Sequence, residues 1–242
     1  MKIVYSILIA FTAFTACAKK RYHHTAVNMN NKDTTVKTAG NTLHYLALGD
    51  SYTIGESVPA DESYPNLLAS ALTAQKHPVS SPTIIAVTGW TTDNLINAIS
   101  QAGLTGKKYD LVTLLIGVND QYQHLSQDNY KVKFQQVLNT AIHFAGGNKD
   151  HVFVLSIPDW GVTPFAAGQG SVIGPQIDQF NAINKQISTA ARVNYLDITP
   201  ISRQAANDPD LVAGDGLHPS AKMYSQWVKL LEPIVAEKLK LK

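Results

Sequence analysis

Short apolar runs alternate along the chain with segments in which apolar residues recur every three or four positions. The runs end in glycine or polar residues and predict buried strands, whereas the recurring pattern predicts amphipathic helices. The predicted strands cover residues 43–49, 82–89, 109–117, 151–158 and 193–199. The predicted helices cover residues 64–75, 91–102, 130–145, 177–191 and 222–240. Pro233 lies inside the last helix and is expected to kink or split it.

Strands that alternate with helices in this way predict an α/β fold, in which one parallel sheet carries helices on both faces. The run YDLVTLLIG at 109–117 is almost continuously apolar, as expected of a strand that helices cover on both sides. The chain has 242 residues, 45% of them hydrophobic, which suits one domain with a substantial core. We expect that domain to cover residues 43–242.

The beginning of the chain, MKIVYSILIAFTAFTACAKKR, predicts export from the cytoplasm. Lys2 precedes an apolar segment at 3–16 that is typical of a signal peptide and too short for a membrane-spanning helix. Small residues then precede Cys17, the only cysteine of the chain, so residues 1–17 resemble a bacterial lipoprotein signal in which this cysteine is lipidated. The alternative is an ordinary secretory signal that is cleaved near Ala18, so that Cys17 is lost.

Residues 18–42 are rich in Asn, Thr and Lys without an apolar period, which predicts a flexible tether. We therefore expect a lipoprotein that faces the periplasm or cell surface and touches the membrane only through its N-terminal lipid, or else a soluble secreted or periplasmic protein. A net charge of +2 gives no reason to expect a nucleic-acid partner. The sequence leaves the oligomeric state open, and a monomer is favoured. No disulfide is expected, because Cys17 has no second cysteine to pair with.

Residues with chemical potential follow the predicted strands. The first strand ends in Gly-Asp-Ser at 49–51, the second in Gly89, the third in GVND at 117–120, and the last leads to DGLHP at 215–219. In an open parallel sheet the carboxyl ends of the strands lie at one edge, and ligands bind there. We therefore expect these residues to form a single site.

Ser51 and His218 are candidates for a nucleophile and its base. A serine hydroxyl needs a base to take its proton, and imidazole titrates near neutral pH. Asp215 lies three residues before His218, so on a turn its carboxylate can hold the imidazole N–H and stabilise the imidazolium. The backbone N–H groups of Ser51 and Gly89 and the side-chain amide of Asn119 are candidate oxyanion donors, and glycine at 89 would allow an ester to approach closely.

Ser51 in GDSYTIG, Gly89 in VTGW, Asn119 in GVND and His218 in DGLHP, in this order, resemble the four residues that name the SGNH hydrolases, or GDSL esterase/lipase family. The resemblance covers about residues 43–240 and implies a flavodoxin-like three-layer α/β/α sandwich with a five-stranded parallel sheet. It also implies that Ser51 is the nucleophile, that Gly89 and Asn119 help to form the oxyanion hole, and that Asp215 orients the base His218. The activity implied is that of a serine carboxylic ester hydrolase, and neither a cofactor nor a metal is expected.

The substrate is less well defined by the sequence. Residues 156–175 join the fourth strand to the next helix, carry Trp160 and Phe165, and are expected to form a lid or an acyl-group wall. Together with Tyr52, which stands where the family's short name has Leu, and Trp90, they could line an apolar pocket for short or medium acyl chains. Ordinary packing of these aromatic residues is equally compatible with the sequence. A lysophospholipid, a thioester, an aryl ester or a glycan acetyl ester stays open as the substrate.

Two other classes of function are compatible with parts of the pattern. Asp50, Asn119 and His218 could be ligands of a metal-dependent phosphoesterase, but such sites need more Asp and His than this motif offers. A non-catalytic binding module on the same fold is the second alternative, although Ser51 and His218 are both in place. We expect Asp50 to order the loop around Ser51 and Asp120 to brace its own turn.

Overall fold

The structure is a computed structural model that describes residues 42–241. The predicted signal peptide at 1–17 with Cys17, and the predicted tether up to residue 41, lie outside the described residues. Within 42–241, none of the helices combines the length and apolar character that crossing a membrane requires.

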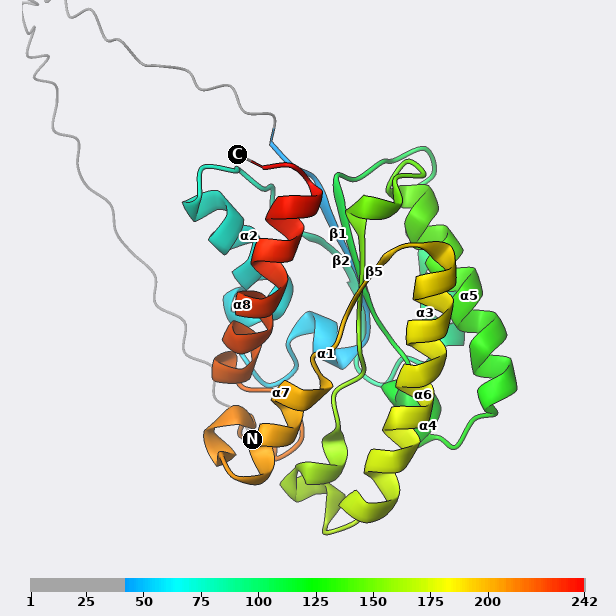
Figure 1. The fold of residues 1–242 in the computed structure, drawn as a ribbon, viewed down its shortest axis with the longest axis vertical. Coiled ribbons are helices and arrows are strands. Elements are labelled where there is room, and N and C mark those ends of the chain that lie inside the picture. The colour runs from blue at the N-terminus through cyan, green and yellow to red at the C-terminus, as the bar shows by residue number, and fades with distance from the viewer. Residues whose placement is uncertain (1–41, 242) are drawn as a thin grey trace, which may run out of the picture. The chain divides into compact units, whose positions relative to one another are not determined.

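A single sheet of five parallel strands lies at the centre of the described residues (Figure 1). Its strands are β1 (Tyr45–Gly49), β2 (Thr83–Ala86), β3 (Leu111–Leu115), β4 (Val152–Leu155) and β5 (Asn194–Leu196). The order across the sheet is β2-β1-β3-β4-β5, so the chain first moves to one side of β1 and then to the other. This order is that of the flavodoxin-like doubly wound fold, whose switch point lies between β1 and β3. The predicted fold class and all five strands are confirmed.

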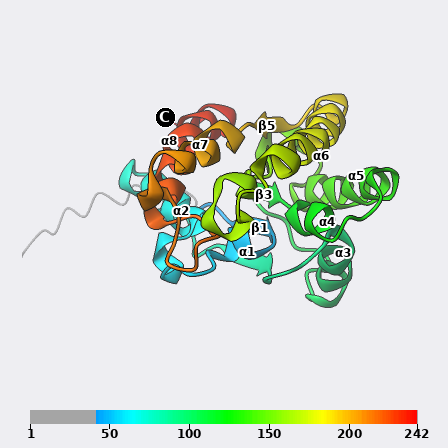
Figure 2. The same ribbon diagram turned by 90° about the horizontal axis from the view of Figure 1, so that it is seen from below.

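The helices cover both faces of this sheet (Figures 1 and 2). They are α1 (Ser51–Ile54), α2 (Tyr64–Ala74), α3 (Thr92–Gln101), α4 (Val118–Tyr122), α5 (Gln127–Phe144), α6 (Gly170–Ala191), α7 (Thr199–Arg203) and α8 (Ala221–Lys238). The long helices α2 and α8 pack together on one face, and α3, α5 and α6 form the layer on the other. Strands β1, β3 and β4 are therefore buried along their whole length, as the near-continuous apolar run at 109–117 predicted.

The structure corrects two expectations about the helices, a split at Pro233 and the beginning of the helix predicted at 177–191. Pro233 does not split α8, which runs without a break from Ala221 to Lys238. Leu231 and Val235, on either side of the proline, are fully buried, and this packing holds the helix together although one backbone hydrogen bond is missing. Helix α6 begins at Gly170 rather than at residue 177, so the second half of the predicted loop at 156–175 is helical in part.

Candidate active site

Ser51 is the first residue of α1 and directly follows the turn at the end of β1. Asp50 caps this helix, because its carboxylate oxygen Oδ1 accepts the backbone N–H of Tyr52 at 3.0 Å. A Cβ atom at Gly49 would clash with the side chain of Thr53 and with the carbonyl of Leu115, so only glycine lets α1 fold back this tightly. Asp50 thus orders the Ser51 turn, as predicted.

The carboxyl group of Asp50 is fully buried beneath this turn, and its Oδ2 has no hydrogen-bond partner among the described residues. Burial raises its pKa from 3.8 to about 8, although the N–H of Tyr52 lowers it, and the nearby carboxylate of Asp120 adds to the rise. Asp50 is therefore mainly protonated at neutral pH.

Asp215 and His218 lie in one turn of the connection between α7 and α8. The Nδ1 atom of His218 donates to Oδ2 of Asp215 at 2.5 Å, and Oδ1 accepts the backbone N–H groups of Leu217 at 2.9 Å and His218 at 3.0 Å. The spacing of three residues thus brings carboxylate and imidazole together, as expected. Burial alone would raise the pKa of Asp215, but its hydrogen bonds, first that from the His218 ring, hold the pKa well below its usual range.

A further donor to Asp215 was missed from the sequence. The hydroxyl of Ser57 donates to Oδ2 of Asp215 at 2.7 Å. Ser57 has a φ of 66°, in the left-handed region that serine rarely adopts. Its neighbour Glu56 accepts a hydrogen bond from the hydroxyl of Thr88, next to Gly89. Glu56 and Ser57 thus connect the segment after α1 to the loop of Thr88 and to the turn of Asp215. In the sequence, the only signal for these contacts is that both residues come soon after the GDS motif.

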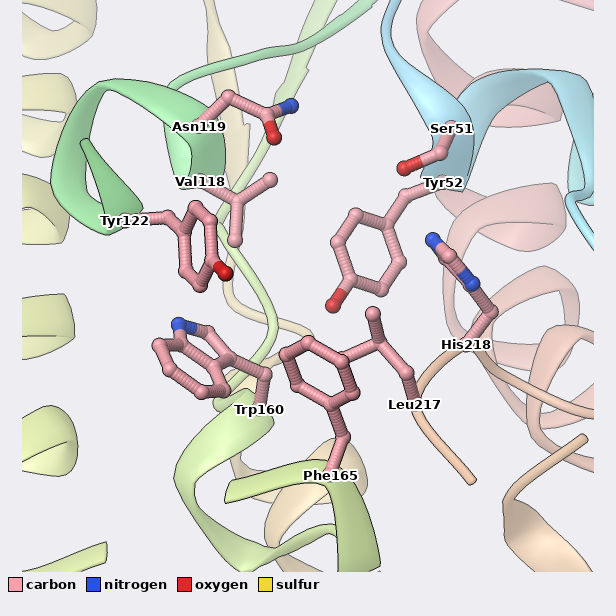
Figure 3. Close-up of a pocket in the computed structure, with 9 residues that line it drawn as sticks. All are labelled: Ser51, Tyr52, Val118, Asn119, Tyr122, Trp160, Phe165, Leu217 and His218. Carbon is pink, nitrogen blue, oxygen red and sulfur yellow. The ribbon is translucent and has the colours of Figure 1, made fainter. Parts of the chain in front are cut away.

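Ser51, Asn119 and His218 lie around one cavity of about 130 Å³ (Figure 3). Its lining residues are Ser51, Tyr52, Val118, Asn119, Tyr122, Trp160, Phe165, Leu217 and His218. Figure 3 shows the Ser51 hydroxyl and a ring nitrogen of His218 on the same side of the cavity. Among the described residues no hydrogen bond joins the two side chains, and such bonds often tighten only when substrate binds. Because Nδ1 of His218 is held by Asp215, Nε2 is the nitrogen left for Ser51.

The structure places Asn119 and Gly89 differently. Asn119 lies in α4 beside the cavity, and its amide nitrogen donates one hydrogen to the Trp90 carbonyl at 3.0 Å, which leaves the second N–H available. Gly89 and Trp90 are not among the cavity-lining residues. A Cβ atom at residue 89 would meet no atom of the described residues within 4 Å, so protein packing does not require glycine here. Its φ of +82° in the turn after β2 favours glycine.

The aromatic wall of the cavity is only partly the predicted one. Tyr52, Trp160 and Phe165 line the cavity as expected, whereas Trp90 packs against the hydrophobic core. Tyr122 was missed and forms a cluster with Trp160 and Phe165, with ring centroids 5.5 to 6.4 Å apart. Two further lining residues, Val118 and Leu217, were also missed. The sequence did contain a signal for these three residues. Val118 and Leu217 are the neighbours of Asn119 and His218, and Tyr122 follows Asn119 by about one helical turn.

Trp160 belongs to a packed wall rather than to a lid. Its indole Nε1–H donates to Oε1 of Gln121 at 2.8 Å. A Cβ atom at Gly170 would lie 2.6 Å from the carbonyl oxygen of Gly161, so these two glycines let the short 3-10 helix Trp160–Val162 pack directly on α6. The glycines of the predicted loop therefore provide close packing here, and not flexibility.

Asp120 does not brace its own turn, and that prediction is wrong. Its Oδ2 accepts the backbone N–H of Thr92 at 2.9 Å and the Thr92 hydroxyl at 3.0 Å, so it joins α4 to the beginning of α3. Burial raises the pKa of Asp120 to about 6, against the lowering effect of the two bonds from Thr92. Residues 42–241 bring no three His, Cys, Asp or Glu side chains close enough to hold a metal ion.

Comparison with known families shows the family to which the chain belongs. The family model described as "GDSL-like Lipase/Acylhydrolase family" matches residues 47–226, which include Ser51, Asn119, Asp215 and His218. The chain belongs to the GDSL family. No curated protein sequence matches it.

Solved structures of two esterases and a lipase/acylhydrolase share the fold at low sequence identity. The esterase EstA from Pseudoalteromonas sp. has a TM-score of 0.63 at 15% identity, over 82% of this chain and 99% of that chain. The lipase/acylhydrolase from Enterococcus faecalis has a TM-score of 0.63 at 20% identity, over 83% of this chain and 98% of that chain. The acetylxylan esterase Axe2 from Geobacillus stearothermophilus has a TM-score of 0.62 at 17% identity, over 84% and 96%. These similarities support the three-layer fold.

Tyr52 is the residue at which this chain departs from the four letters of the GDSL name. Its ring is buried and lies 5.3 Å from the His218 ring, centroid to centroid, at an angle of 57°. Burial raises the pKa of its hydroxyl above the usual range, so Tyr52 is neutral at all working pH values. In this member of the GDSL family, an aromatic ring thus packs against the candidate base.

Proposed function

We propose that this protein is a serine esterase that hydrolyses carboxylic esters through an acyl-enzyme intermediate on Ser51. One observation carries the proposal: an Asp215–His218 pair, joined at 2.5 Å, shares the rim of an apolar cavity with Ser51. Membership of the GDSL-like lipase/acylhydrolase family supports the same reaction class.

In this proposal His218 takes the proton of Ser51 through Nε2 while Oγ attacks the ester carbonyl. The imidazolium that forms lies against Asp215, which stays ionised because its pKa is held low. His218 then gives the proton to the departing alcohol, and a water molecule cleaves the acyl-enzyme by the same steps. Neither a cofactor nor a metal takes part.

The oxyanion of the tetrahedral intermediate would be held by the backbone N–H of Ser51 and by the free N–H of the Asn119 amide. The N–H of Gly89 is a third proposed donor. Gly89 lies outside the cavity lining, so its loop would have to approach the bound ester. The bond between Glu56 and Thr88 supports a defined position of this loop beside α1.

The cavity lining supports short to medium acyl esters, because aromatic and aliphatic side chains surround Ser51. A carbohydrate O-acetyl esterase on the same triad is the second candidate. It is favoured by the rings of Tyr122 and Phe165, which are 50% and 49% exposed at the cavity and offer faces on which a sugar can pack. The structural similarity to the acetylxylan esterase Axe2 is compatible with it.

We further propose that the protein is exported and anchored through a lipid on Cys17. The support is the sequence of residues 1–17, with its apolar segment and its single cysteine. Cys17→Ser should move the protein from the membrane fraction to the soluble fraction of bacterial cells that express the full chain. An unchanged distribution would contradict lipidation at Cys17.

Hydrolysis of p-nitrophenyl esters from acetate to decanoate tests the proposed reaction. The wild-type protein should turn them over, and Ser51→Ala should abolish turnover without changing the circular dichroism spectrum. An alkyl phosphonate inhibitor should add one mass to the wild type and none to Ser51→Ala. Full activity of Ser51→Ala would show that the nucleophile is a different residue. If the wild type is inactive on these esters, acetylated oligosaccharides test the second candidate.

A further inference from the structure

We propose that the cavity accepts acyl chains of about six carbons or fewer, and that Gln121 sets this limit by fixing Trp160 as the far wall. This inference rests on the proposed esterase function. It goes further because it names the substrate class and the residue that determines it.

The cavity has a volume of about 130 Å³. An apolar cavity of roughly 150 Å³ in a protein interior holds a benzene molecule, which has six carbon atoms. The present cavity is open to solvent beside Tyr122 and Phe165, which are 50% and 49% exposed, so the comparison applies to an acyl chain that lies in the space between Ser51 and Trp160.

Trp160 lies at the far end of the cavity. Figure 3 shows its indole across the cavity from Ser51, with Tyr52 and Val118 on either side of the space between the two residues. An acyl chain bound to Ser51 and directed into the cavity therefore meets this ring. Trp160 is only 9% exposed, so the ring fills the end of the cavity instead of swinging into solvent.

Gln121 holds Trp160 through a buried hydrogen bond. The residue is 3% exposed, and both ends of its amide form hydrogen bonds. Its Oε1 accepts the indole N–H of Trp160 at 2.8 Å, and its Nε2 donates to Oε1 of Gln176 in α6 at 2.7 Å. The indole N–H can only donate, so it determines that the oxygen of the Gln121 amide faces Trp160. Breaking either bond would leave a buried polar group without a partner, so the indole is held in one orientation.

Close packing supports Trp160 from behind. The 3-10 helix that carries it lies on α6 through the close approach of Gly161 and Gly170. Asp159, just before Trp160, accepts the N–H of Gly161 at 2.8 Å and the Nε–H of Arg203 at 2.9 Å. The wall therefore cannot move back to admit a longer chain without breaking buried contacts.

The test compares kcat/KM for p-nitrophenyl butyrate, hexanoate, octanoate and decanoate, below the concentrations at which the esters aggregate. For the purified wild type we expect kcat/KM to fall at least about tenfold from hexanoate to decanoate, since methylenes that do not fit a pocket discriminate at this level. Trp160→Ala should raise the decanoate-to-hexanoate ratio about tenfold, and Gln121→Met about threefold. Trp160→Phe, which keeps a ring but loses the N–H, should shift the ratio in the same direction and serves if Trp160→Ala does not fold.

The chain offers a control for the loss of an amide–amide hydrogen bond to α6. Gln127, which is exposed where Gln121 is buried, donates its side-chain amide to Gln179 of α6 at 2.7 Å, one helical turn from Gln176, and it does not line the cavity. Gln127→Met should leave the chain-length profile unchanged. A wild type that prefers decanoate, or Trp160 and Gln121 variants that keep the wild-type ratio, would overturn the inference while the esterase function stands. A wild type that hydrolyses no ester would contradict the proposed function instead.

Discussion

Asp215 accepts more hydrogen bonds than any other candidate catalytic group. Some of these bonds come from its own turn, and one comes from a distant segment of the chain. The bonds from the N–H groups of Leu217 and His218 come from its own turn and fix the carboxylate locally. The bond from Ser57 comes from a residue 158 positions away in the sequence. It connects the turn that carries the base to the segment that follows the nucleophile. We therefore expect Ser57 to act as a positioning residue through Asp215.

Ser57→Ala should lower kcat about fivefold to tenfold and change KM little, because a bond to a charged group is lost. Ser57→Gly should lower kcat equally, yet be at least as stable to urea, since glycine suits a φ of 66°. In an Asp215→Asn background, where the rate is already low, Ser57→Ala should have almost no further effect. Full additivity in this double-mutant cycle would show that Ser57 does not act through Asp215.

The raised pKa of Asp50 predicts that the stability of the protein depends on pH. Its pKa in the folded state is about 8, above the ordinary value of 3.8, so the stabilising effect of its protonated form is complete below pH 4 and is lost as the pH rises towards 8. Asn at 50 can still accept the N–H of Tyr52 but cannot ionise. The difference in unfolding free energy, Asp50→Asn minus wild type, should therefore grow by ~1.4 kcal/mol per pH unit between pH 5 and 7.

Urea unfolding of both proteins at pH 5, 6 and 7 measures this difference. Asp120, the charged neighbour of Asp50, is present in both proteins, so its own titration largely cancels. Parallel stability curves would show that Asp50 has the same pKa in the folded and unfolded states.

At the scale of elements, the short helix α4 has several tasks at once. Asn119 and Tyr122 face the cavity, Gln121 holds Trp160, and Asp120 binds the beginning of α3 through Thr92. Asp120→Ala should destabilise the protein by about 1–3 kcal/mol and also lower kcat, because both bonds that position α4 are lost. Asp120→Asn keeps an acceptor for Thr92 and is the matched control, with a smaller loss expected. Chemical denaturation and ester kinetics on the same samples would contradict this link if stability fell while kcat did not.

The elements also show what a sequence can and cannot predict. Strands β1, β3 and β4 were predicted because covered parallel strands are almost continuously apolar. The short helices α1, α4 and α7 were not, since four or five residues cannot display an apolar period. Ser51, Asn119 and the Asp215–His218 turn were found because each lies at a strand end or within one local turn. The partners Ser57 and Gln121 depend on contacts between distant segments, which no local pattern encodes.

At the scale of the whole molecule, the strand order brings the candidate residues together. Ser51 follows β1 and Asn119 follows β3, the two strands on either side of the switch point, and His218 reaches the same edge from the connection before α8. The arrangement brings together the proposed nucleophile, base and amide donor. Residues 42–241 provide no set of three Asp, Glu, His or Cys ligands at this edge or elsewhere. A metal-dependent phosphoesterase and a serine esterase on this fold should respond in opposite ways to the removal of metal ions.

Dialysis against EDTA should leave the rate of p-nitrophenyl acetate hydrolysis unchanged, because the proposed acyl transfer needs only Ser51, His218 and their hydrogen-bond partners. Adding Zn²⁺ or Mn²⁺ afterwards should not raise the rate, and bis-p-nitrophenyl phosphate should not be hydrolysed with or without metal. Activity that EDTA removes and either ion restores would favour the phosphoesterase. The Ser51→Ala variant separates the two chemistries in the same assay: it removes the nucleophile of the esterase, whereas a metal-activated water would still attack.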